Sequence, residues 1–179
     1  IEQVWLRAVN RPRSASRLCC APSAVPPSML FDMASRVARS ASSDQSLPDQ
    51  LQLQWVRKLP PLEVAWPDQE MMWFDRQYEP IVVGQRMFVG SSLTASLKAY
   101  DTRSGAQLWE FRADGPIRFA PAAWKDKVFV TSDDGYLYCL NGDDGGLVWK
   151  HRGGPSDRLA LGNDRLISLW PARGGPVVT

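Results

Sequence analysis

The chain has 179 residues, 44% of them apolar, and its 21 basic and 19 acidic side chains leave a net charge of +2. This near balance excludes a dedicated binder of nucleic acid or of anionic membranes, and the apolar fraction excludes a disordered chain. A single histidine and three cysteines exclude a multi-histidine metal centre and a disulfide-stapled mini-fold. No run reaches the roughly 18 apolar residues of a transmembrane helix. We therefore expect no nucleic-acid partner and no membrane span.

The first 50 residues differ in composition from the rest of the chain. They hold seven alanines, nine serines and five prolines, and neither a helical nor a strand period persists in them. This composition predicts a low-complexity, disordered leader over residues 1–50. No signal peptide is visible. Because the chain starts at Ile1 and stops at Thr179, directly after an apolar run, we expect a fragment of a longer protein.

Residues 51–179 contain an internal repeat with a period of about 40 residues. Matches occur first at an offset of 41 residues and then, after a slip of one residue, at an offset of 40. The matching pairs are Pro80 with Pro121, Phe88 with Phe129, Val89 with Val130, Ser91 with Ser132, Leu97 with Leu137, Asp101 with Asn141, Gly105 with Gly145, and Trp109 with Trp149. A period near 40 built from short strands is typical of β-propellers.

Each repeat has the pattern of four short antiparallel strands. The expected strands are residues 80–83, 87–90, 96–100 and 107–111 in the first repeat, and 121–124, 128–131, 136–140 and 147–151 in the second. Turn signals separate them, notably Asp133-Asp134-Gly135 and the turns that begin at Asp101 and Asn141. Four strands in about 40 residues make one propeller blade. The sequence therefore predicts an all-β fold, a partial β-propeller of four-stranded antiparallel sheets.

The repeat also predicts where the units begin and end. Trp55 marks the end of a preceding blade, and residues 175–178 match the inner strand 80–83. We expect a blade end at 51–58, an insertion at 59–78, blades at 79–111 and 120–151, an insertion at 152–174, and the start of the next blade at 175–179. Because residues 164–168 echo residues 126–130, the second insertion could instead contain a strand of a degenerate blade.

Six positions define the repeat: Asp101, Gly105, Trp109, Asn141, Gly145 and Trp149. The two tryptophans matter most, because a single blade cannot bury both of its faces and a wide ring at a fixed position can fill the gap to the next blade. We therefore expect both rings to lie between blades. For a buried ring, Trp149→Ala would cost about 3–5 kcal/mol.

Segments 99–109 and 139–149 resemble the repeat of PQQ-like β-propellers. They read Ala-Tyr-Asp-Thr-Arg-Ser-Gly-Ala-Gln-Leu-Trp and Cys-Leu-Asn-Gly-Asp-Asp-Gly-Gly-Leu-Val-Trp, against a family pattern of roughly A-L-D-x-x-T-G-x-x-x-W. Ser104 and Asp144 replace the usual threonine, and Asn141 replaces the aspartate. The family includes quinoprotein alcohol dehydrogenases and the scaffold lipoprotein of the outer-membrane assembly machinery. The resemblance covers residues 51–179 and implies export to the periplasm or cell envelope.

Two of the connections between blades are long. Trp55 to Pro80 spans 25 residues and Trp149 to Pro176 spans 27, against 12 for the connection between Trp109 and Pro121. In a propeller these connections emerge on one rim, and long loops on a rigid scaffold are where binding usually occurs. The candidate binding surface comprises Trp66, Trp73, Arg118, Asp157, Arg158, Trp170 and Arg173. The alternative is that the loops form a plug over the funnel mouth.

The sequence offers no catalytic or metal-binding constellation. Quinoprotein dehydrogenases carry a vicinal disulfide beside the quinone, but the pair Cys19-Cys20 lies in the leader, outside the repeats. A would-be calcium loop from Asn141 fails because its twelfth residue is Arg152. His151 has no Gly-x-Ser-x-Gly partner, and we expect Cys139 to belong to the core.

These observations favour a non-catalytic binding or scaffold module that takes a protein or a small molecule at its rim. One alternative is a fragment of a quinoprotein alcohol dehydrogenase whose PQQ and calcium ligands lie in blades outside this sequence. Another is a partner-binding protein that uses the long rim loops. We expect no catalytic residue, metal ligand or cofactor within this chain.

Overall fold

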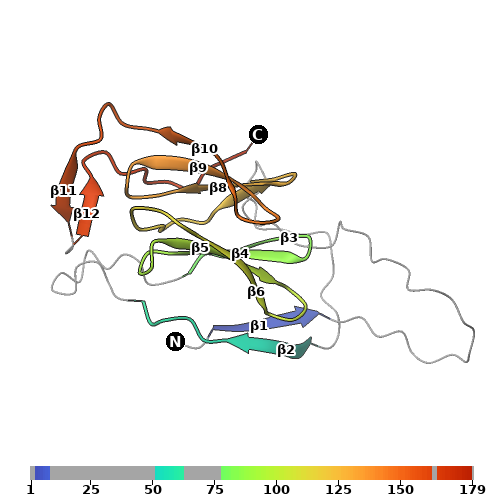
Figure 1. Cartoon of the computed structure of the whole chain (residues 1–179). Helices are drawn as coiled ribbons and strands as arrows, with labels where there is room; N and C mark the ends of the chain where they lie inside the picture. The colour runs from blue at the N-terminus through green and yellow to red at the C-terminus, as the bar shows by residue number, and fades with distance from the viewer. Residues whose placement is uncertain (1–2, 9–50, 63–77, 163–164, 179) are drawn as a thin grey trace, which may run out of the picture.

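The computed structural model describes residues 3–8, 51–62, 78–162 and 165–178. Throughout these ranges every regular element is a β-strand, and the strands form two four-stranded and two two-stranded antiparallel sheets. Figure 1 shows the two four-stranded sheets stacked face to face, with one two-stranded sheet below them and the other beside one end. The all-β fold with propeller-type blades is therefore confirmed.

The two central sheets are the two predicted blades. The first blade contains β3 (Ile81–Val83), β4 (Arg86–Ser91), β5 (Ser96–Asp101) and β6 (Gln107–Arg112), and the second contains β7 (Ala122–Trp124), β8 (Lys127–Thr131), β9 (Tyr136–Asn141) and β10 (Leu147–Arg152). Each is an antiparallel meander in chain order. Every strand begins and ends within one residue of the range that the repeat predicts.

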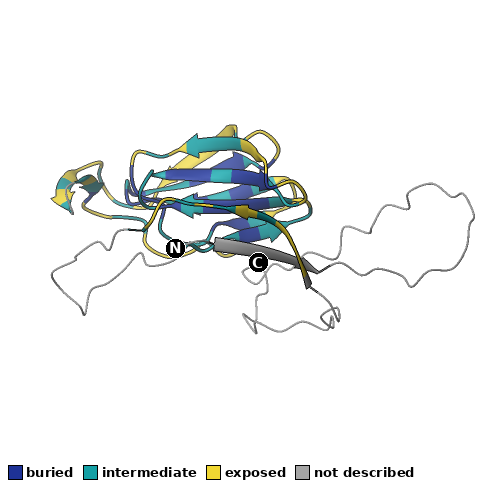
Figure 2. Ribbon diagram, turned by 90° about the horizontal axis from the view of Figure 1, so that it is seen from below, coloured by how far each residue is buried: buried dark blue, intermediate teal, exposed yellow. Residues whose placement is uncertain are grey.

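Side chains alternate between the two faces of each strand, and this alternation builds the core. On β4, Phe88 faces the second blade, whereas Met87 and Val89 face β2 (Leu51–Arg57) on the other side. Across from Phe88, Val128 and Val130 complete the core between the blades. Figure 2 shows that the buried residues concentrate in these stacked strands. The first blade is therefore covered on both faces.

The turn after the third strand of each blade is held by an Asx side chain. In the first blade, Asp101 Oδ1 accepts hydrogen bonds from the Ser104 N–H at 2.7 Å, the Ser104 hydroxyl at 2.8 Å and the Arg103 N–H at 3.0 Å. These donors, those of Ser104 first, hold the pKa of the Asp101 carboxyl below its usual value. In the second blade, Asn141 Oδ1 accepts from the Asp143 N–H at 2.9 Å.

A tryptophan from one sheet packs on the turn of the next sheet at both described junctions. Trp55 Nε1 donates to the Thr102 carbonyl at 2.9 Å, and Trp109 Nε1 donates to the Gly142 carbonyl at 3.1 Å. The same contact therefore recurs once per blade: the indole N–H satisfies a turn carbonyl while the ring covers the turn glycine. A glycine is needed because the ring lies directly above its α-carbon.

Trp149 differs from Trp109, and the expectation that it lies between blades is wrong for this chain. Its ring rests against Phe129, with centroids 6.0 Å apart, much as Trp109 rests against Phe88 at 5.6 Å. Trp149 is nevertheless 43% exposed, and all six residues of β10 are exposed. The physical reason is that no described segment covers this face of the second blade. The cost predicted for a buried Trp149 ring therefore belongs to Trp109.

Two further expectations need correction. Residues 3–8, which we assigned to a disordered leader, form β1 (Gln3–Ala8), antiparallel to β2. The main-chain hydrogen bonds of the strand pair supply the order that composition does not reveal. Residues 1–2 and 9–50 lie outside the described part of the chain. The expected inner strand at 175–178 is not a strand, because no described strand lies beside it to form a ladder.

Placing a methyl group on the turn glycine of the second blade tests the junction directly. Gly145 has a φ of +74°, and a Cβ there would lie 2.5 Å from Cε3 of Trp109. We expect Gly145→Ala to lower the free energy of unfolding by about 2–3 kcal/mol, from the left-handed backbone and the clash together. Urea denaturation measures this loss. Gly84→Ala is the control, because Gly84 has a similar φ of +60° with open space around it; an equal loss in both variants would contradict the role of the ring.

Candidate functional site

The connections that follow the fourth strand of each blade lie at the same end of the stacked sheets as the turns between the second and third strands, and we call this end the rim. The rim comprises residues 92–95, 113–120, 132–135, 153–162 and 165–174, and hydrogen bonds join these segments to one another. Of the predicted surface residues, Arg118, Asp157, Arg158, Trp170 and Arg173 lie in it. Trp66 and Trp73 lie outside the described residues.

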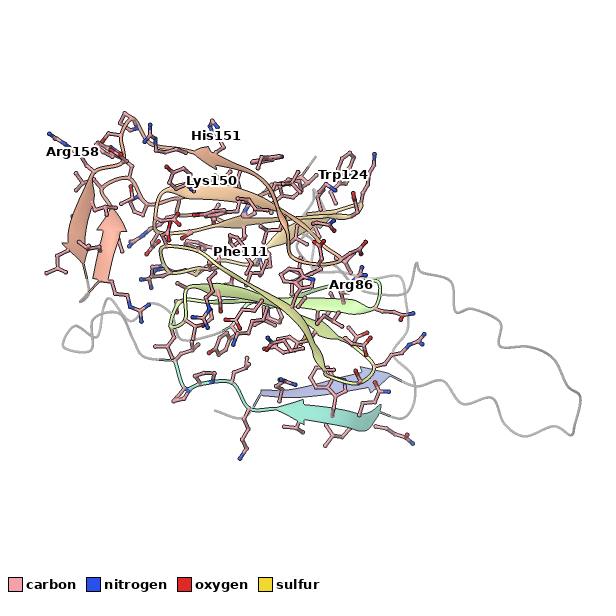
Figure 3. All side chains as sticks on the ribbon, viewed as in Figure 1. Arg86, Phe111, Trp124, Lys150, His151 and Arg158 are labelled. Atoms are coloured by element: carbon pink, nitrogen blue, oxygen red, sulfur yellow. The ribbon has the colours of Figure 1, made fainter. Side chains whose placement is uncertain are left out.

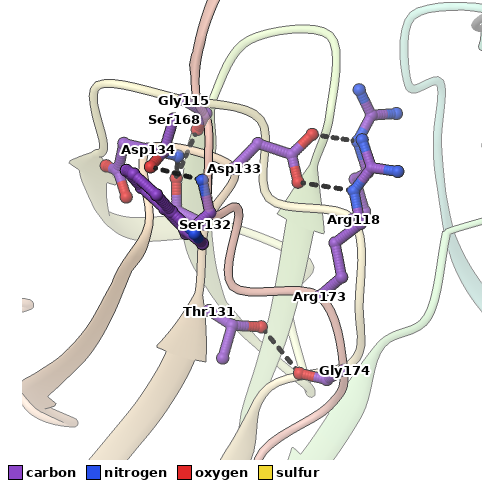
Figure 4. Close-up of polar contacts among 10 residues, drawn as sticks. Gly115, Arg118, Thr131, Ser132, Asp133, Asp134, Ser168, Arg173 and Gly174 are labelled. Carbon is purple, nitrogen blue, oxygen red and sulfur yellow. Dashed lines mark hydrogen bonds and ion pairs between the residues drawn. The ribbon is translucent and has the colours of Figure 1, made fainter. Parts of the chain in front are cut away.

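Asp133 is the centre of the rim. Its Oδ2 accepts a 2.6 Å ion-paired hydrogen bond from Arg118 Nε, and its Oδ1 lies 3.6 Å from Arg173 Nε (Figure 4). The side chain of Asp133 is 1% exposed and that of Arg118 is 12% exposed. The structure thus brings together two arginines that are 55 positions apart in sequence by means of a buried carboxylate that the sequence analysis treated only as a turn residue.

The main chain of Asp133 is tied to the same segments. Its N–H donates to the Pro116 carbonyl at 2.9 Å, and its carbonyl accepts from the Ser168 N–H at 2.9 Å. The neighbouring Ser132 hydroxyl donates to the Gly115 carbonyl at 2.9 Å. One β-hairpin turn therefore fixes the connection that precedes its blade and the connection that follows it.

Asp134 completes the turn with a second set of bonds. Its Oδ2 accepts from the Tyr138 hydroxyl at 2.6 Å and from the Asp114 N–H at 3.2 Å, and its Oδ1 accepts from the Tyr136 N–H at 2.9 Å. Burial, and then the hydrogen bond to this carboxylate, raise the pKa of the Tyr138 phenol. Tyr138 therefore acts as a neutral donor to Asp134.

The exposed part of the rim lies beside this buried network. Trp170 is 40% exposed and packs over Gly154, where a Cβ would lie 2.6 Å from the Cβ of Trp170. Asp157 and Arg158 are exposed, and the Arg173 side chain is 41% exposed. Of the predicted surface residues that the structure describes, these four are accessible to a partner. Arg118 instead contributes through its buried ion pair.

The second insertion contains a strand pair. The sequence left this possibility open, because residues 164–168 resemble residues 126–130. Strands β11 (Leu159–Gly162) and β12 (Arg165–Ser168) form an antiparallel hairpin. Arg165 secures it to the first blade by donating to the carbonyls of Ser92 at 2.8 Å and Leu93 at 2.9 Å. Sequence reasoning missed Arg165 as it missed Asp133, because each acts on a segment far away in the chain.

The carboxylates at the centre of the rim are already engaged by other residues of the chain. No group of three or more His, Cys, Asp or Glu among the described residues could hold a metal ion. Asp133 and Asp134 already use their carboxylate oxygens for the ion pairs and hydrogen bonds described above. His151 is exposed at the end of β10, and Cys139 is a buried free thiol whose pKa is raised by that burial. The Cys19-Cys20 pair falls outside the described ranges.

Nothing helical in the described part of the chain has the length and apolarity to cross a bilayer.

Comparison with known protein families now gives the class of protein. The family profile described as "Outer membrane protein assembly factor BamB" matches residues 49–169, about two thirds of the chain. The chain therefore belongs to this family of PQQ-like β-propeller repeat proteins. The comparison with curated proteins found no match.

Several solved structures align with part of this chain. BamB from Moraxella catarrhalis is 20% identical, with a TM-score of 0.37, over 49% of this chain and 34% of that chain. The quinohemoprotein alcohol dehydrogenase from Comamonas testosteroni is 27% identical, with a TM-score of 0.44, over 56% and 15%. A europium-containing methanol dehydrogenase is 18% identical, with a TM-score of 0.44, over 60% and 20%. The matched region thus spans about a third of BamB and a fifth or less of each dehydrogenase.

Proposed function

We propose that this chain is part of a non-catalytic β-propeller module that binds a protein partner through its rim and serves outer-membrane protein assembly. Membership of the BamB family supports the assembly role. The observation that carries the proposal is the Arg118–Asp133–Arg173 network, which fixes connections from both sides of the second blade into one surface. A surface whose loops are already ordered pays less entropy on binding.

The exposed residues around the network are of the kinds that dominate protein interfaces. Trp170, Arg158 and Arg173 are a tryptophan and two arginines, and these residue types are enriched among the side chains that contribute most binding energy. They stand on loops held by a rigid sheet stack, as binding residues commonly do. A position in the periplasm or cell envelope accompanies this proposal, because that is where an assembly factor for outer-membrane proteins acts.

Site-specific photo-crosslinking tests the rim as the binding surface. A photoreactive phenylalanine at Arg158 or Trp170, in the full chain produced with export to the periplasm, is expected to form an adduct with one envelope protein. The matched controls are Arg103 and Asp144, exposed positions on the turns at the opposite end of the blades. Adducts from the controls alone, or from none of the four positions, would contradict a rim-binding function.

A second measurement separates this proposal from a quinoprotein oxidoreductase. Adding PQQ and calcium to the longer protein that we expect to contain this chain should leave the quinone spectrum unshifted and give no dye-linked alcohol oxidation. A spectral shift that saturates with that protein, or alcohol-dependent dye reduction, would overturn the non-catalytic assignment.

A further inference from the structure

The hairpin β11–β12 presents an apolar face to solvent. Leu159, Leu161 and Leu166 are 55%, 76% and 61% exposed, and Leu161 lies directly opposite Leu166 in the strand register. Because side chains alternate along a strand, Leu159 and Leu161 share one face, and Leu166 joins them from the partner strand. Three leucines are therefore exposed to solvent together on one face of a short sheet.

This face is held outward by the contacts on the other side of the hairpin. Arg165 reaches from the opposite face to the carbonyls of Ser92 and Leu93 on the first blade. The neighbouring Leu166 consequently points away from the blades. Two main-chain bonds fix the base of the hairpin: the Leu169 N–H donates to the Arg158 carbonyl and the Ser168 N–H to the Asp133 carbonyl, both at 2.9 Å. Figure 3 shows the hairpin standing out from the rim end of the stacked sheets, near the labelled Arg158.

The segment of the chain that contains the leucines is basic in composition. Residues 150–178 hold five basic side chains and two acidic ones, whereas the whole chain has a net charge of only +2. Arg158, at the base of the hairpin, is exposed; its main-chain N–H donates to the Ser156 hydroxyl and its carbonyl accepts from the Leu169 N–H. Among the described residues the Arg158 side chain has no carboxylate partner, and an arginine in this state beside an apolar face complements a ligand that is both apolar and acidic.

The shape of the hairpin indicates an extended ligand. Its sheet has two strands in the described part of the chain, so each strand has an unpaired edge. An added strand would satisfy those main-chain groups and place alternate side chains over the leucines. A second copy of the chain fits less well, because a stable dimer buries about 800 Å² on each partner, far more than three leucines offer.

We propose that the leucine face of β11–β12, with Arg158, binds an extended protein segment in which apolar and acidic residues alternate. This rests on the binding function proposed above and names the chemistry of the partner. The apolar side chains of the segment cover Leu159, Leu161 and Leu166, and a carboxylate of the segment pairs with the Arg158 guanidinium.

Fluorescence anisotropy with a defined peptide tests the proposal. The probe is a labelled twelve-residue peptide in which leucine alternates with glutamate, titrated with the full chain at pH 8. The double variant Leu161→Asp/Leu166→Asp is expected to weaken binding about tenfold or more, because both changes place charge on the apolar contact. These residues are on the surface, so the variant keeps its fold, which circular dichroism verifies. Arg158→Glu is expected to weaken binding as well.

The controls make each outcome decisive. The double variant Leu108→Asp/Leu147→Asp changes two leucines that are 47% and 51% exposed on the outer strands of the two blades; it is expected to bind the peptide as the unchanged chain does. Loss of binding in this variant instead would place the site on the blades and overturn the proposal. If a peptide in which lysine replaces glutamate bound as tightly as the leucine–glutamate peptide, the proposal that the partner is acidic would be overturned. Binding of the hairpin to phosphatidylglycerol vesicles, but not to the peptide, would also overturn it. The quinone measurement above tests the non-catalytic function independently of all these outcomes.

Discussion

Replacing Trp109 by alanine is expected to lower the free energy of unfolding by about 3–5 kcal/mol. The ring packs in the core between the two blades, lies 5.6 Å from the Phe88 ring, and covers Gly145. Its Nε1 also donates to the Gly142 carbonyl. Alanine leaves a cavity between the blades and one turn carbonyl without its donor, and neighbouring side chains cannot fill the gap because the sheets fix their positions.

Trp149→Ala is the matched control. Trp149 occupies the same position of the next repeat and makes the same kind of contact with a phenylalanine, but it is 43% exposed. We expect Trp149→Ala to lower the free energy of unfolding by about 1 kcal/mol, because the ring packs against the protein on one face and its other face stays in water. Urea denaturation followed by circular dichroism compares the two variants. Equal losses would show that the stabilisation comes from packing within a blade and not from contact between blades.

Asp133→Asn is expected to lower the free energy of unfolding by about 3–5 kcal/mol. The change removes the negative charge from a buried ion pair and leaves the Arg118 guanidinium, 12% exposed, without that compensation. The amide keeps the size of the side chain, so the loss is electrostatic. The rim segment that Arg173 anchors should loosen at the same time. Faster tryptic cleavage after Arg173 would report this loosening separately from global unfolding.

The control for this variant is a second aspartate–arginine pair on the surface. Asp143 lies 2.7 Å from Arg86, with side chains 63% and 41% exposed. Asp143→Asn is expected to cost at most about 1 kcal/mol, since water already solvates both charges. If the two aspartate variants lost equal stability, the buried network would not be what holds the rim together.

The repeat was predictable from the sequence because its contacts join residues that are close along the chain or that recur at a fixed spacing. Asp101 and Gly105 form their turn within five residues, and Trp109 reaches Gly145, the same turn one repeat later. Alternating apolar residues such as those of β4 and β8 then assign one face of each strand to the core. The strands could therefore be placed to within one residue.

The candidate site was only partly predictable. The sequence placed Arg118 and Arg173 on a common rim from loop lengths, but nothing in the spacing of the two indicated that both would meet Asp133. The role of Arg165 was equally hidden, because its acceptors are main-chain carbonyls more than 70 residues away. Main-chain acceptors have no side-chain signature, so no composition or motif reveals them.

The sequence alone determined the unit of this protein: a four-stranded sheet, repeated, with an Asx turn and a terminal tryptophan. It did so because strand periodicity, turn chemistry and repeat spacing are local properties of the chain. The tertiary structure decided which tryptophan packs between two blades, which carboxylate joins the rim, and which face of the hairpin is exposed to solvent. Those outcomes depend on the neighbours that three-dimensional packing brings to each side chain: Trp109 has a blade on either side, whereas Trp149 has one only.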